Sequence, residues 1–171
     1  KNHHFYDAIK TPLEIILALI LFIALSPLFI LIFALIKITS KGNVIYKQER
    51  VGQNNKTFTL YKFRTMNNSI AGPHWTEVND KRITFVGKTL RFSHLDELPQ
   101  LFNIIKGDIS FIGPRPERTE LAKEYSQLSY YEIRHFIKPG VTGWAQINFK
   151  QSTSLNEAYQ KLCYDFYYIK N

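Results

Sequence analysis

The longest apolar run in the chain extends over 22 residues, from Ile15 to Ile36 ("IILALILFIALSPLFILIFALI"), and contains no charged residue. As a helix with a rise of about 1.5 Å per residue, it is long enough to cross a bilayer core of roughly 30 Å. Ser26 and Pro27 interrupt the run near its midpoint, and Pro27 has no N–H to donate to the carbonyl of Ile23. The pattern predicts either a kinked single span or a helix–break–helix that enters and leaves through one leaflet.

Basic residues flank this segment on both sides: Lys1 and Lys10 precede it, and Lys37, Lys41 and Lys47 follow it. A helix that spans a membrane usually carries an excess of Lys and Arg at its cytoplasmic end. Because the two ends are similar here, the charges favour the second alternative, in which both ends face the cytoplasm.

A β-hairpin is predicted after the apolar segment. The stretches Val44–Arg50 ("VIYKQER") and Thr57–Met66 ("TFTLYKFRTM") are rich in residues that favour strands, and Gly52–Lys56 between them supplies turn residues. The polar stretch Asn67–Asp80 then predicts a loop.

Helices dominate the remainder of the pattern. We predict helices at Val86–Phe92 and Glu97–Lys106, the second with Asp96 as N-cap and Gly107 just beyond its end. The apolar face of the second helix consists of Leu98, Leu101, Phe102 and Ile105. A short strand (108–113) and a helix from Glu117 to about Leu128 follow.

The last helix begins at the capping box Ser154–Glu157, and its inner face is predicted to carry Tyr159, Leu162 and Phe166. The single cysteine, Cys163, excludes an internal disulfide and is predicted to pack in the core of this region. With 171 residues, the chain has the size of one domain with a core of its own.

The charge balance narrows the choice of partners. The chain has 22 Lys and Arg residues against 14 Asp and Glu, a formal charge of +8. Such a surplus favours a polyanion: a nucleotide diphosphate, an anionic lipid surface or nucleic acid. The five histidines lack the spacing of a zinc site, so zinc is not expected.

Adjacent carboxylates stand in the stretch "HLDELPQL", at Asp96 and Glu97. Such residues at a helix start are ordinary capping residues that the helix dipole favours. Adjacent carboxylates can also hold Mg²⁺ while one of them attacks phosphorus. Arg91 could offset their repulsion or bind a phosphate oxygen.

Three further stretches carry candidate phosphate ligands. In "FIGPRPER", Pro114 and Pro116 fix the backbone around Arg115, which favours bidentate phosphate binding, although a loop salt bridge is the alternative. Glu117 and Arg118 are interpreted as helix-start residues. The stretch "IKPGVTGWAQIN" (137–148) is either a phosphate- or ribose-binding loop or a plain turn before a strand, with Trp144 in the core. Lys62 and Arg64 in "YKFRTM" form either a basic strip near the membrane or a solvated face.

The motifs "SPLF", "YKFRTM", "LDELPQLFNIIKGDISFIGPRPER", "KPGVTGWAQIN" and "YDFYYIKN", in this order and spacing, closely resemble the bacterial sugar transferase family. These are the monotopic phosphoglycosyl transferases, which begin polyprenyl-linked glycan assembly. The forms "GPRPER" and "KLCYDFYYIKN" look most like the catalytic domain of larger exopolysaccharide or O-antigen initiating enzymes. The resemblance covers nearly the whole chain.

The resemblance implies an α+β, membrane-associated monotopic fold. Residues 1–40 would form a re-entrant helix–break–helix hairpin, broken at Ser26 and Pro27. Residues 41–171 would form a cytoplasmic catalytic domain with a small β-hairpin and several amphipathic helices. The two parts would be one functional unit at the bacterial inner membrane, with its catalytic face in the cytoplasm.

The resemblance also implies a reaction, the transfer of a sugar 1-phosphate from a UDP-sugar to undecaprenyl phosphate with release of UMP. Asp96 would be the nucleophile that forms a covalent aspartyl–phosphosugar intermediate, with Glu97 as its partner and Mg²⁺ bound at both. The candidate substrate-binding residues lie in the same motifs: Arg115, Arg91, Lys62, Arg64, Lys138, Gly140, Thr142, Gly143 and Gln146.

The alternative function is a non-catalytic, membrane-anchored scaffold of an envelope polysaccharide complex, with the acids as helix caps. An intact Asp96–Glu97 pair and Arg115 argue against it, because a scaffold has no need of them. A nucleic-acid partner is not expected, because the chain lacks a recognition motif. A homo-oligomer is left open. Lys138 and "NFK" (148–150) depart from the commoner pattern of the family, which leaves the sugar open.

Overall fold

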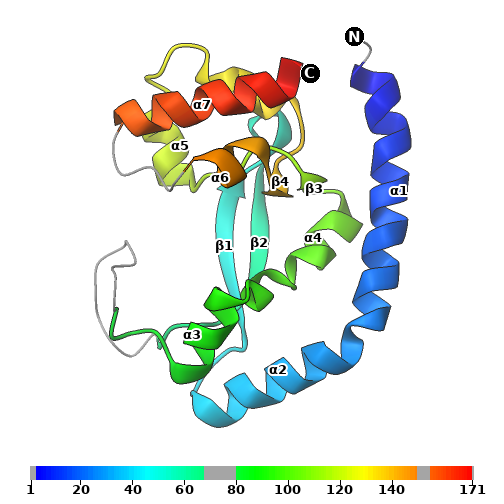
Figure 1. Cartoon of the computed structure of the whole chain (residues 1–171), viewed down its shortest axis with the longest axis vertical. Helices are drawn as coiled ribbons and strands as arrows, with labels where there is room; N and C mark the ends of the chain where they lie inside the picture. The colour runs from blue at the N-terminus through cyan, green and yellow to red at the C-terminus, as the bar shows by residue number, and fades with distance from the viewer. Residues whose placement is uncertain (1–2, 68–79, 150–154, 171) are drawn as a thin grey trace.

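The computed structural model describes residues 3–67, 80–149 and 155–170 and combines helices with two small sheets (Figure 1). The helices are α1 (His3–Ala24), α2 (Ser26–Thr39), α3 (Phe85–Phe92), α4 (Gln100–Lys106), α5 (Thr119–Tyr125), α6 (Trp144–Asn148) and α7 (Leu155–Lys170), with the short 3₁₀ helices η1 (Gln53–Asn55), η2 (Leu95–Glu97) and η3 (Tyr131–Phe136). The strands are β1 (Ile45–Val51), β2 (Thr57–Phe63), β3 (Ser110–Ile112) and β4 (Gly140–Thr142). This content confirms the predicted α+β class.

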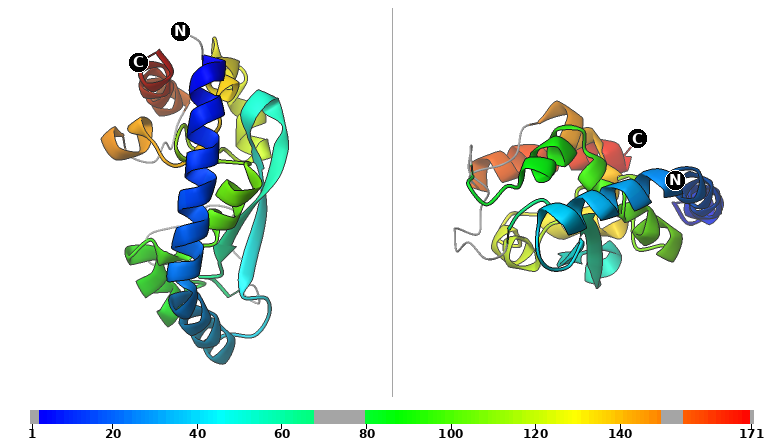
Figure 2. Two further views of the ribbon diagram at one scale, coloured as in Figure 1. Left: turned by 90° about the vertical axis from the view of Figure 1, so that its right-hand side faces the viewer. Right: turned by 90° about the horizontal axis from the view of Figure 1, so that it is seen from below.

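The β1–β2 ribbon runs through the middle of the molecule (Figure 1). Helix α1 stands along one side of it for most of the long axis, and α2 turns beneath it (Figures 1 and 2). Helices α5, α6 and α7 gather at the opposite end from α2, beside the start of α1. The chain therefore wraps its N-terminal helices around two faces of the remaining fold.

Helices α1 and α2 meet at the predicted break. Only Leu25 separates them, and Pro27 is in the first turn of α2. Backbone hydrogen bonds continue on both sides, from Leu25 N to the Leu21 carbonyl (2.9 Å) and from Phe29 N to the Leu25 carbonyl (3.0 Å). Among the described residues, no single helix has the length and hydropathy to cross a membrane. Ala8–Ala24 and Ser26–Thr39 reach both only as a pair, which is bent by 61°.

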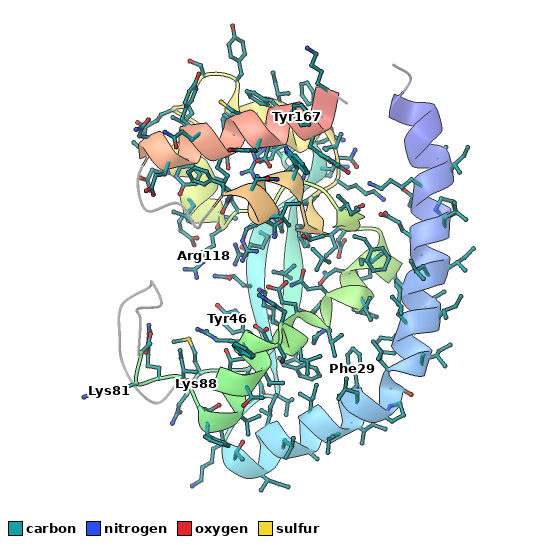
Figure 3. All side chains as sticks on the ribbon, viewed as in Figure 1. Phe29, Tyr46, Lys81, Lys88, Arg118 and Tyr167 are labelled. Carbon is teal, nitrogen blue, oxygen red and sulfur yellow. The ribbon has the colours of Figure 1, made fainter. Side chains whose placement is uncertain are left out.

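Apolar packing on the inside of this bend holds the two helices to the fold. Phe29 lies in the angle between them, with its ring 5.1 Å from that of Phe22 and 5.5 Å from that of Phe63 on β2 (Figure 3). Two core clusters meet there, one around α1 and α4 and one around α2 and α3: Ala18, Leu60, Leu101, Ile104 and Ile109 in the first, and Ile32, Ile36, Val44, Phe63 and Leu90 in the second. The bend is therefore filled by side chains and is not a free hinge.

The predicted hairpin is confirmed. Strands β1 and β2 pair antiparallel from Ile45 opposite Phe63 to Val51 opposite Thr57. In the turn, Asn54 and Asn55 adopt left-handed φ angles of 54° and 59°, which asparagine tolerates better than most residues. Strand β2 ends three residues before the predicted Met66.

The prediction of one continuous helix at Glu97–Lys106 with Asp96 as N-cap is wrong. The chain forms η2 first, and α4 begins at Gln100, after Pro99. Pro99 lacks an N–H, so the bonds before it have the three-residue spacing of a 3₁₀ turn, as from Leu98 N to the Leu95 carbonyl. The predicted end is confirmed, because Gly107 caps α4 with a φ of 79°.

The C-terminal third departs further from its prediction. Residues 137–148 form β4 and α6, and β4 pairs parallel with β3. Trp144 is not in the core; its side chain is partly exposed and stacks on Tyr167. The predicted strand and helix at 108–128 shrink to β3 and α5. The capping residue Ser154 and most of the predicted loop 67–80 lie outside the described residues.

Two predictions about α7 are wrong. Cys163 is exposed and Tyr159 is half exposed. The face of α7 that packs on α5 and η3 is centred on Ala158 and Leu162, with Phe166 beside it. Cys163 lies about 100° around the helix from Leu162, which turns it to solvent.

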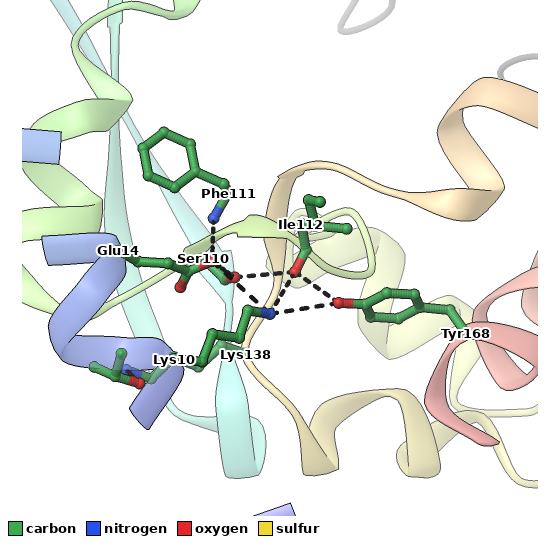
Figure 4. Close-up of polar contacts among 8 residues, drawn as sticks. Lys10, Glu14, Ser110, Phe111, Ile112, Lys138 and Tyr168 are labelled. Carbon is green, nitrogen blue, oxygen red and sulfur yellow. Dashed lines mark hydrogen bonds and ion pairs between the residues drawn. The ribbon is translucent and has the colours of Figure 1, made fainter. Parts of the chain in front are cut away.

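Polar contacts attach α1 to β3 and α7 (Figure 4). We call this set the polar clasp: Lys10, Glu14, Ser110, Phe111, Ile112 and Tyr168. Glu14 Oε1 accepts hydrogen bonds from Ser110 Oγ at 2.6 Å and from Phe111 N at 3.2 Å. Lys10 Nζ donates to the Ile112 carbonyl at 3.2 Å and lies 3.8 Å from Glu14.

Helix α7 joins the clasp through Tyr168. Its hydroxyl donates to the same Ile112 carbonyl at 3.0 Å and is 3.4 Å from Lys10 Nζ. One carbonyl of β3 thus receives hydrogen bonds from the first and the last helix of the chain. The apolar helix α1 is therefore bound to the rest of the fold by polar contacts as well as by packing.

We expect Glu14→Ala to destabilise the protein by about 1–3 kcal/mol, because the Phe111 N–H loses its acceptor and the buried Ser110 hydroxyl keeps only the Ile112 carbonyl. The melting temperature of the detergent-solubilised protein should fall by several degrees. Glu124→Ala removes an exposed carboxylate on α5 and serves as the control, with a change near zero. Equal melting temperatures for wild type and Glu14→Ala would show that the clasp does not stabilise the fold.

Candidate active site

A cavity of about 570 Å³ lies beside the hairpin, at the meeting point of η2, the residues before α5, β4, α6 and α7. Its charged lining consists of four basic and two acidic side chains: Arg50, Arg115, Arg118, Lys161, Glu97 and Glu117. The remaining lining residues are His94, Leu121, Tyr125, Val141, Thr142, Gln146, Ile147 and Phe149. The surplus of positive charge suits a polyanion, and the apolar and aromatic part of the wall can cover a ring.

Arg115 projects from between Pro114 and Pro116, as predicted from the sequence. Within the described ranges its guanidinium has no ion-pair partner. Burial, together with the charge of Arg115, lowers the pKa of Arg50 to about 10. Two guanidinium groups that repel each other in one cavity are a site for an anion that would neutralise both.

One member of the carboxylate pair, Glu97, lies in the wall of the cavity, and Asp96 is not among the lining residues. Lys62 Nζ on β2 lies 2.5 Å from Glu97 Oε1. Burial would raise the pKa of Glu97, but the Lys62 ammonium outweighs it and holds this pKa below its usual value. Asp96 is 9% exposed, and burial raises the pKa of its carboxyl although Lys62 opposes the shift. The two neighbours thus differ: one is held ionised by a lysine, and the other is buried without an ion pair of its own among the described residues.

The side chain of Asn103 on α4 attaches α4 to β2 and so brings Lys62 and Glu97 together. This side chain is fully buried, and its amide accepts from Tyr61 N at 3.1 Å and donates to the Thr59 carbonyl at 2.7 Å. These two hydrogen bonds pair backbone groups on the edge of β2 that faces away from β1. Since η2 immediately precedes α4, this docking places Glu97 opposite Lys62.

The Asp96–Glu97 pair fits Mg²⁺ chemistry only together with a phosphate ligand. No group of three His, Cys, Asp or Glu side chains that could hold a metal occurs in the described part of the chain. Mg²⁺ in phosphate-handling sites is commonly held by one or two carboxylates, with substrate oxygens and water completing the octahedron. Two adjacent carboxyl groups beside a cationic cavity match that donor set.

The structure brings some of the predicted catalytic and substrate-binding residues to the cavity and leaves others, including Asp96, outside its lining. Four of the predicted residues line it: Glu97, Arg115, Thr142 and Gln146. Lys62 is adjacent through Glu97. Gly140 and Gly143 lie against the backbone of Gly113, where a larger side chain would collide.

Three predicted basic residues make other contacts. Arg64 donates to the carbonyls of Lys41 (2.6 Å) and Ser40 (2.9 Å), and so caps the end of α2. Lys138 contacts Thr11 on α1 at 3.4 Å. Arg91 Nε donates to Thr65 Oγ1 at 2.8 Å, although its charge still acts on Asp96.

Several polar residues of the cavity are not predicted from the sequence: Arg50, His94, Glu117, Arg118 and Lys161. The interpretation of Glu117 and Arg118 as helix-start residues holds, since Arg118 is the N-cap of α5 and Glu117 precedes it, but both side chains also line the cavity. The position of Glu117 and Arg118 directly after Pro-Arg-Pro is the sequence feature that could have indicated a place in the cavity. Arg50 and Lys161 have no such feature, because a basic residue on a strand or a helix is usually solvated.

Comparison with known proteins gives matches over nearly the whole chain. Residues 5–171 match the family described as bacterial sugar transferase. The chain is 41% identical over 169 residues to a UDP-N-acetylgalactosamine-undecaprenyl-phosphate N-acetylgalactosaminephosphotransferase of Aeromonas hydrophila, with 97% of this chain and 40% of that protein covered. It is 38% identical over 175 residues to a UDP-glucose:undecaprenyl-phosphate glucose-1-phosphate transferase of Xanthomonas campestris pv. campestris, with coverage of 98% and 36%.

A shorter relative is covered more completely. The chain is 34% identical over 163 residues to the uncharacterised sugar transferase EpsL of Bacillus subtilis, with 95% of this chain and 78% of that protein covered. Against the Aeromonas and Xanthomonas proteins, by contrast, the chain spans only about two fifths of the relative's length.

We expect Glu117→Gln to destabilise the protein by about 3 kcal/mol at neutral pH. Burial would raise the pKa of Glu117, but Lys161 and Arg134 lower it from 4.5 to about 2. Because the pKa of Glu117 is lower in the folded than in the unfolded protein, its ionisation stabilises the fold at every pH above the unfolded pKa of about 4.5. This contribution is lost as the pH falls from about 4.5 toward 2. The gap in melting temperature between wild type and Glu117→Gln should therefore narrow over that interval.

The control is Glu120→Gln, which changes an exposed carboxylate on α5. It should show little difference from wild type at any pH. A gap for Glu117→Gln that stays constant down to the lowest pH at which wild type is folded would contradict the assigned ion pairs.

Proposed function

The chain belongs to the bacterial sugar transferase family, and we propose that it transfers a sugar 1-phosphate from a UDP-sugar to undecaprenyl phosphate. The observation that carries this proposal is the cavity with four basic side chains whose wall contains Glu97, the sequence neighbour of Asp96. A nucleotide diphosphate sugar matches its charge and its mixed polar and aromatic lining. The substrates are those in the names of the relatives from Aeromonas and Xanthomonas.

In the first step, a carboxylate oxygen of Asp96 attacks the phosphorus that carries the sugar. The bond from this phosphorus to the bridging oxygen breaks, UMP leaves with that oxygen, and an aspartyl–phosphosugar remains. Arg115, Arg50 and Lys161 supply positive charge around the diphosphate, which reduces the repulsion between the two anions. Glu97 lines the cavity and Asp96 is its neighbour in η2, which supports a nucleophile close to a bound diphosphate.

In the second step, a phosphate oxygen of undecaprenyl phosphate attacks the same phosphorus. The bond to Asp96 breaks, the carboxylate is regenerated, and undecaprenyl-diphospho-sugar is the product. Asp96 and Glu97 would hold Mg²⁺ together with phosphate oxygens of the UDP-sugar. When bound, the ion would supply countercharge to the diphosphate. Lys62 keeps Glu97 ionised and therefore available as a ligand.

A re-entrant hairpin at residues 1–40 would place this site at the membrane surface. Three observations support it: the 61° bend, the exposed apolar outer face of both helices, and the lysines at both ends. Ile23 and Ile30 on that face are each 70% exposed and Ile38 is 82% exposed. Such a surface requires an apolar environment.

Helix α3 extends the apolar surface beside α2. Phe85 and Phe92 on it are 89% and 90% exposed, with Lys88 between them in the sequence. Aromatic rings with neighbouring lysines are typical of a membrane interface with anionic lipids. Residues 41–171 would then be the cytoplasmic catalytic part at the bacterial inner membrane, facing an acceptor whose chain is confined to the bilayer.

We expect wild-type protein incubated with Mg²⁺ and a panel of UDP-sugars, without lipid acceptor, to gain the mass of one sugar phosphate. Asp96→Asn should fold and show no gain, because the amide lacks the anionic nucleophile. Glu97→Gln should retain some adduct, and the surface variant Glu120→Gln should behave as wild type. Intact-protein mass spectrometry distinguishes these cases and names the sugar class. An equal gain in Asp96→Asn would refute the nucleophile assignment.

We expect both ends of the membrane segment to label from the cytoplasmic side. Single cysteines at Asn2 and Lys41, introduced into Cys163→Ser, should react in inverted membrane vesicles and stay protected from an impermeant maleimide in spheroplasts. The exposed native Cys163 provides the cytoplasmic reference. Opposite labelling of positions 2 and 41 would establish a single span and exclude the re-entrant hairpin.

A further inference from the structure

The segment that presents Arg115 is held at four consecutive carbonyls, each by a donor from another part of the chain. The donors, for residues 114, 115, 116 and 117 in turn, are Gly140 N (2.9 Å), Arg134 Nη2 (2.9 Å), Arg50 Nη1 (3.0 Å) and Val51 N (3.0 Å). Pro114 and Pro116 also restrict φ on both sides of Arg115. The backbone at Arg115 is thus held in one conformation, and the guanidinium enters the cavity from a fixed starting direction.

Arg134 provides the bond to Arg115 itself. Its side chain, on η3, is 3% exposed, and Nη1 donates to the Tyr131 hydroxyl at 3.1 Å. The nitrogen that bonds the Arg115 carbonyl also lies 2.9 Å from Asp165 Oδ2 on α7, whose side chain is likewise 3% exposed. A single guanidinium nitrogen therefore connects α7 to the backbone of Arg115.

A buried ion pair of this kind contributes little to stability when compared with well-packed apolar groups, because both partners lose their hydration. A guanidinium does provide geometry, since its planar fork makes several hydrogen bonds in set directions. Lysine in the same place could pair with Asp165 but could not also reach the Tyr131 hydroxyl and the Arg115 carbonyl in these directions. The arrangement is suited to placing a loop.

Helix α7 contacts the same segment a second time. Lys161 lies one turn before Asp165, on the same face of α7, and its Nζ is 2.6 Å from Glu117 Oε1. Lys161 and Glu117 both line the cavity and can touch a ligand directly. Arg134 and Asp165 are not among the lining residues, so they act on a ligand through a neighbour. Arg134 contacts two such neighbours: it bonds the Arg115 carbonyl, and its Nη1 lies 3.6 Å from Glu117 Oε1.

We propose that Arg134 and Asp165 are positioning residues for the nucleoside diphosphate sugar, an inference that rests on the proposed function. They hold the Arg115 carbonyl, and with it the direction of the Arg115 guanidinium. The Arg115 side chain then does not have to be ordered when the diphosphate binds, which raises the affinity for the UDP-sugar. Through this pair, α7 determines the affinity for the donor although it contacts the cavity only at Lys161.

The test is the kinetics of Asp165→Asn and Arg134→Lys, measured with the UDP-sugar that forms the adduct. We expect KM for the UDP-sugar to rise about tenfold, kcat to change less than threefold, and KM for undecaprenyl phosphate to stay unchanged. A variant that is only less well folded has fewer active molecules, which lowers kcat and leaves KM as it was. Cys163→Ser, an exposed change on the same helix, is the matched control. An unchanged donor KM in both variants would overturn the proposal.

A second measurement asks whether the effect passes through Arg115. In an Arg115→Ala background, Asp165→Asn should cause no further rise in donor KM, because the group that it positions is gone. A further tenfold rise in that background would show that Asp165 acts on the donor by another route and would also overturn the proposal.

Calorimetric binding of UDP separates this proposal from the proposed function. Binding to wild type that is about tenfold tighter than to Asp165→Asn supports the positioning role even if no UMP is ever released. Release of UMP by wild type together with equal UDP affinity in the two proteins retains the function and rejects the positioning role.

Discussion

The fully buried amide of Asn103 is the interaction on which the arrangement of this protein most depends. A strand edge inside a fold must have its N–H and carbonyl groups paired, and here a side chain on α4 provides the partners. The opposite face of α4 packs on α1 through the cluster around Ala18. One short helix thus joins the hairpin, the bent N-terminal helices and the carboxylate pair, and it brings Glu97 to Lys62.

The cationic side of the cavity is built differently, from residues far apart in the chain. Arg50 comes from β1, Arg115 from the segment between two prolines, and Lys161 from α7. Like charges at close range are unfavourable, so the fold must hold them there. Hydrogen bonds to four successive carbonyls hold the Arg115 segment, and Glu117 pairs with Lys161. The site is accordingly prepared for an anion before the anion arrives.

The polar clasp brings the apolar helices close to this site. Glu14 and Lys10 on α1 bond to β3, and Arg115 follows the end of β3 by three residues. An α1 that rests in a membrane would therefore determine how far the Arg115 segment lies from the membrane surface. This geometry accords with the proposed function, in which the acceptor phosphate would stay at the bilayer surface while the UDP-sugar comes from solution.

The sequence by itself determined the features that depend on neighbours along the chain: the apolar segment and its break at Ser26–Pro27, the hairpin with its asparagine turn, the cap at Gly107, and Arg115 between prolines. These follow from short-range sterics and hydrogen bonding. Only the tertiary structure decided that Arg64 caps α2, that Cys163 faces solvent, that Asp96 is buried before α4 begins, and that Arg50 and Lys161 line the cavity. The role of a long charged side chain depends on which distant surface packing brings within its reach, and no local pattern encodes that.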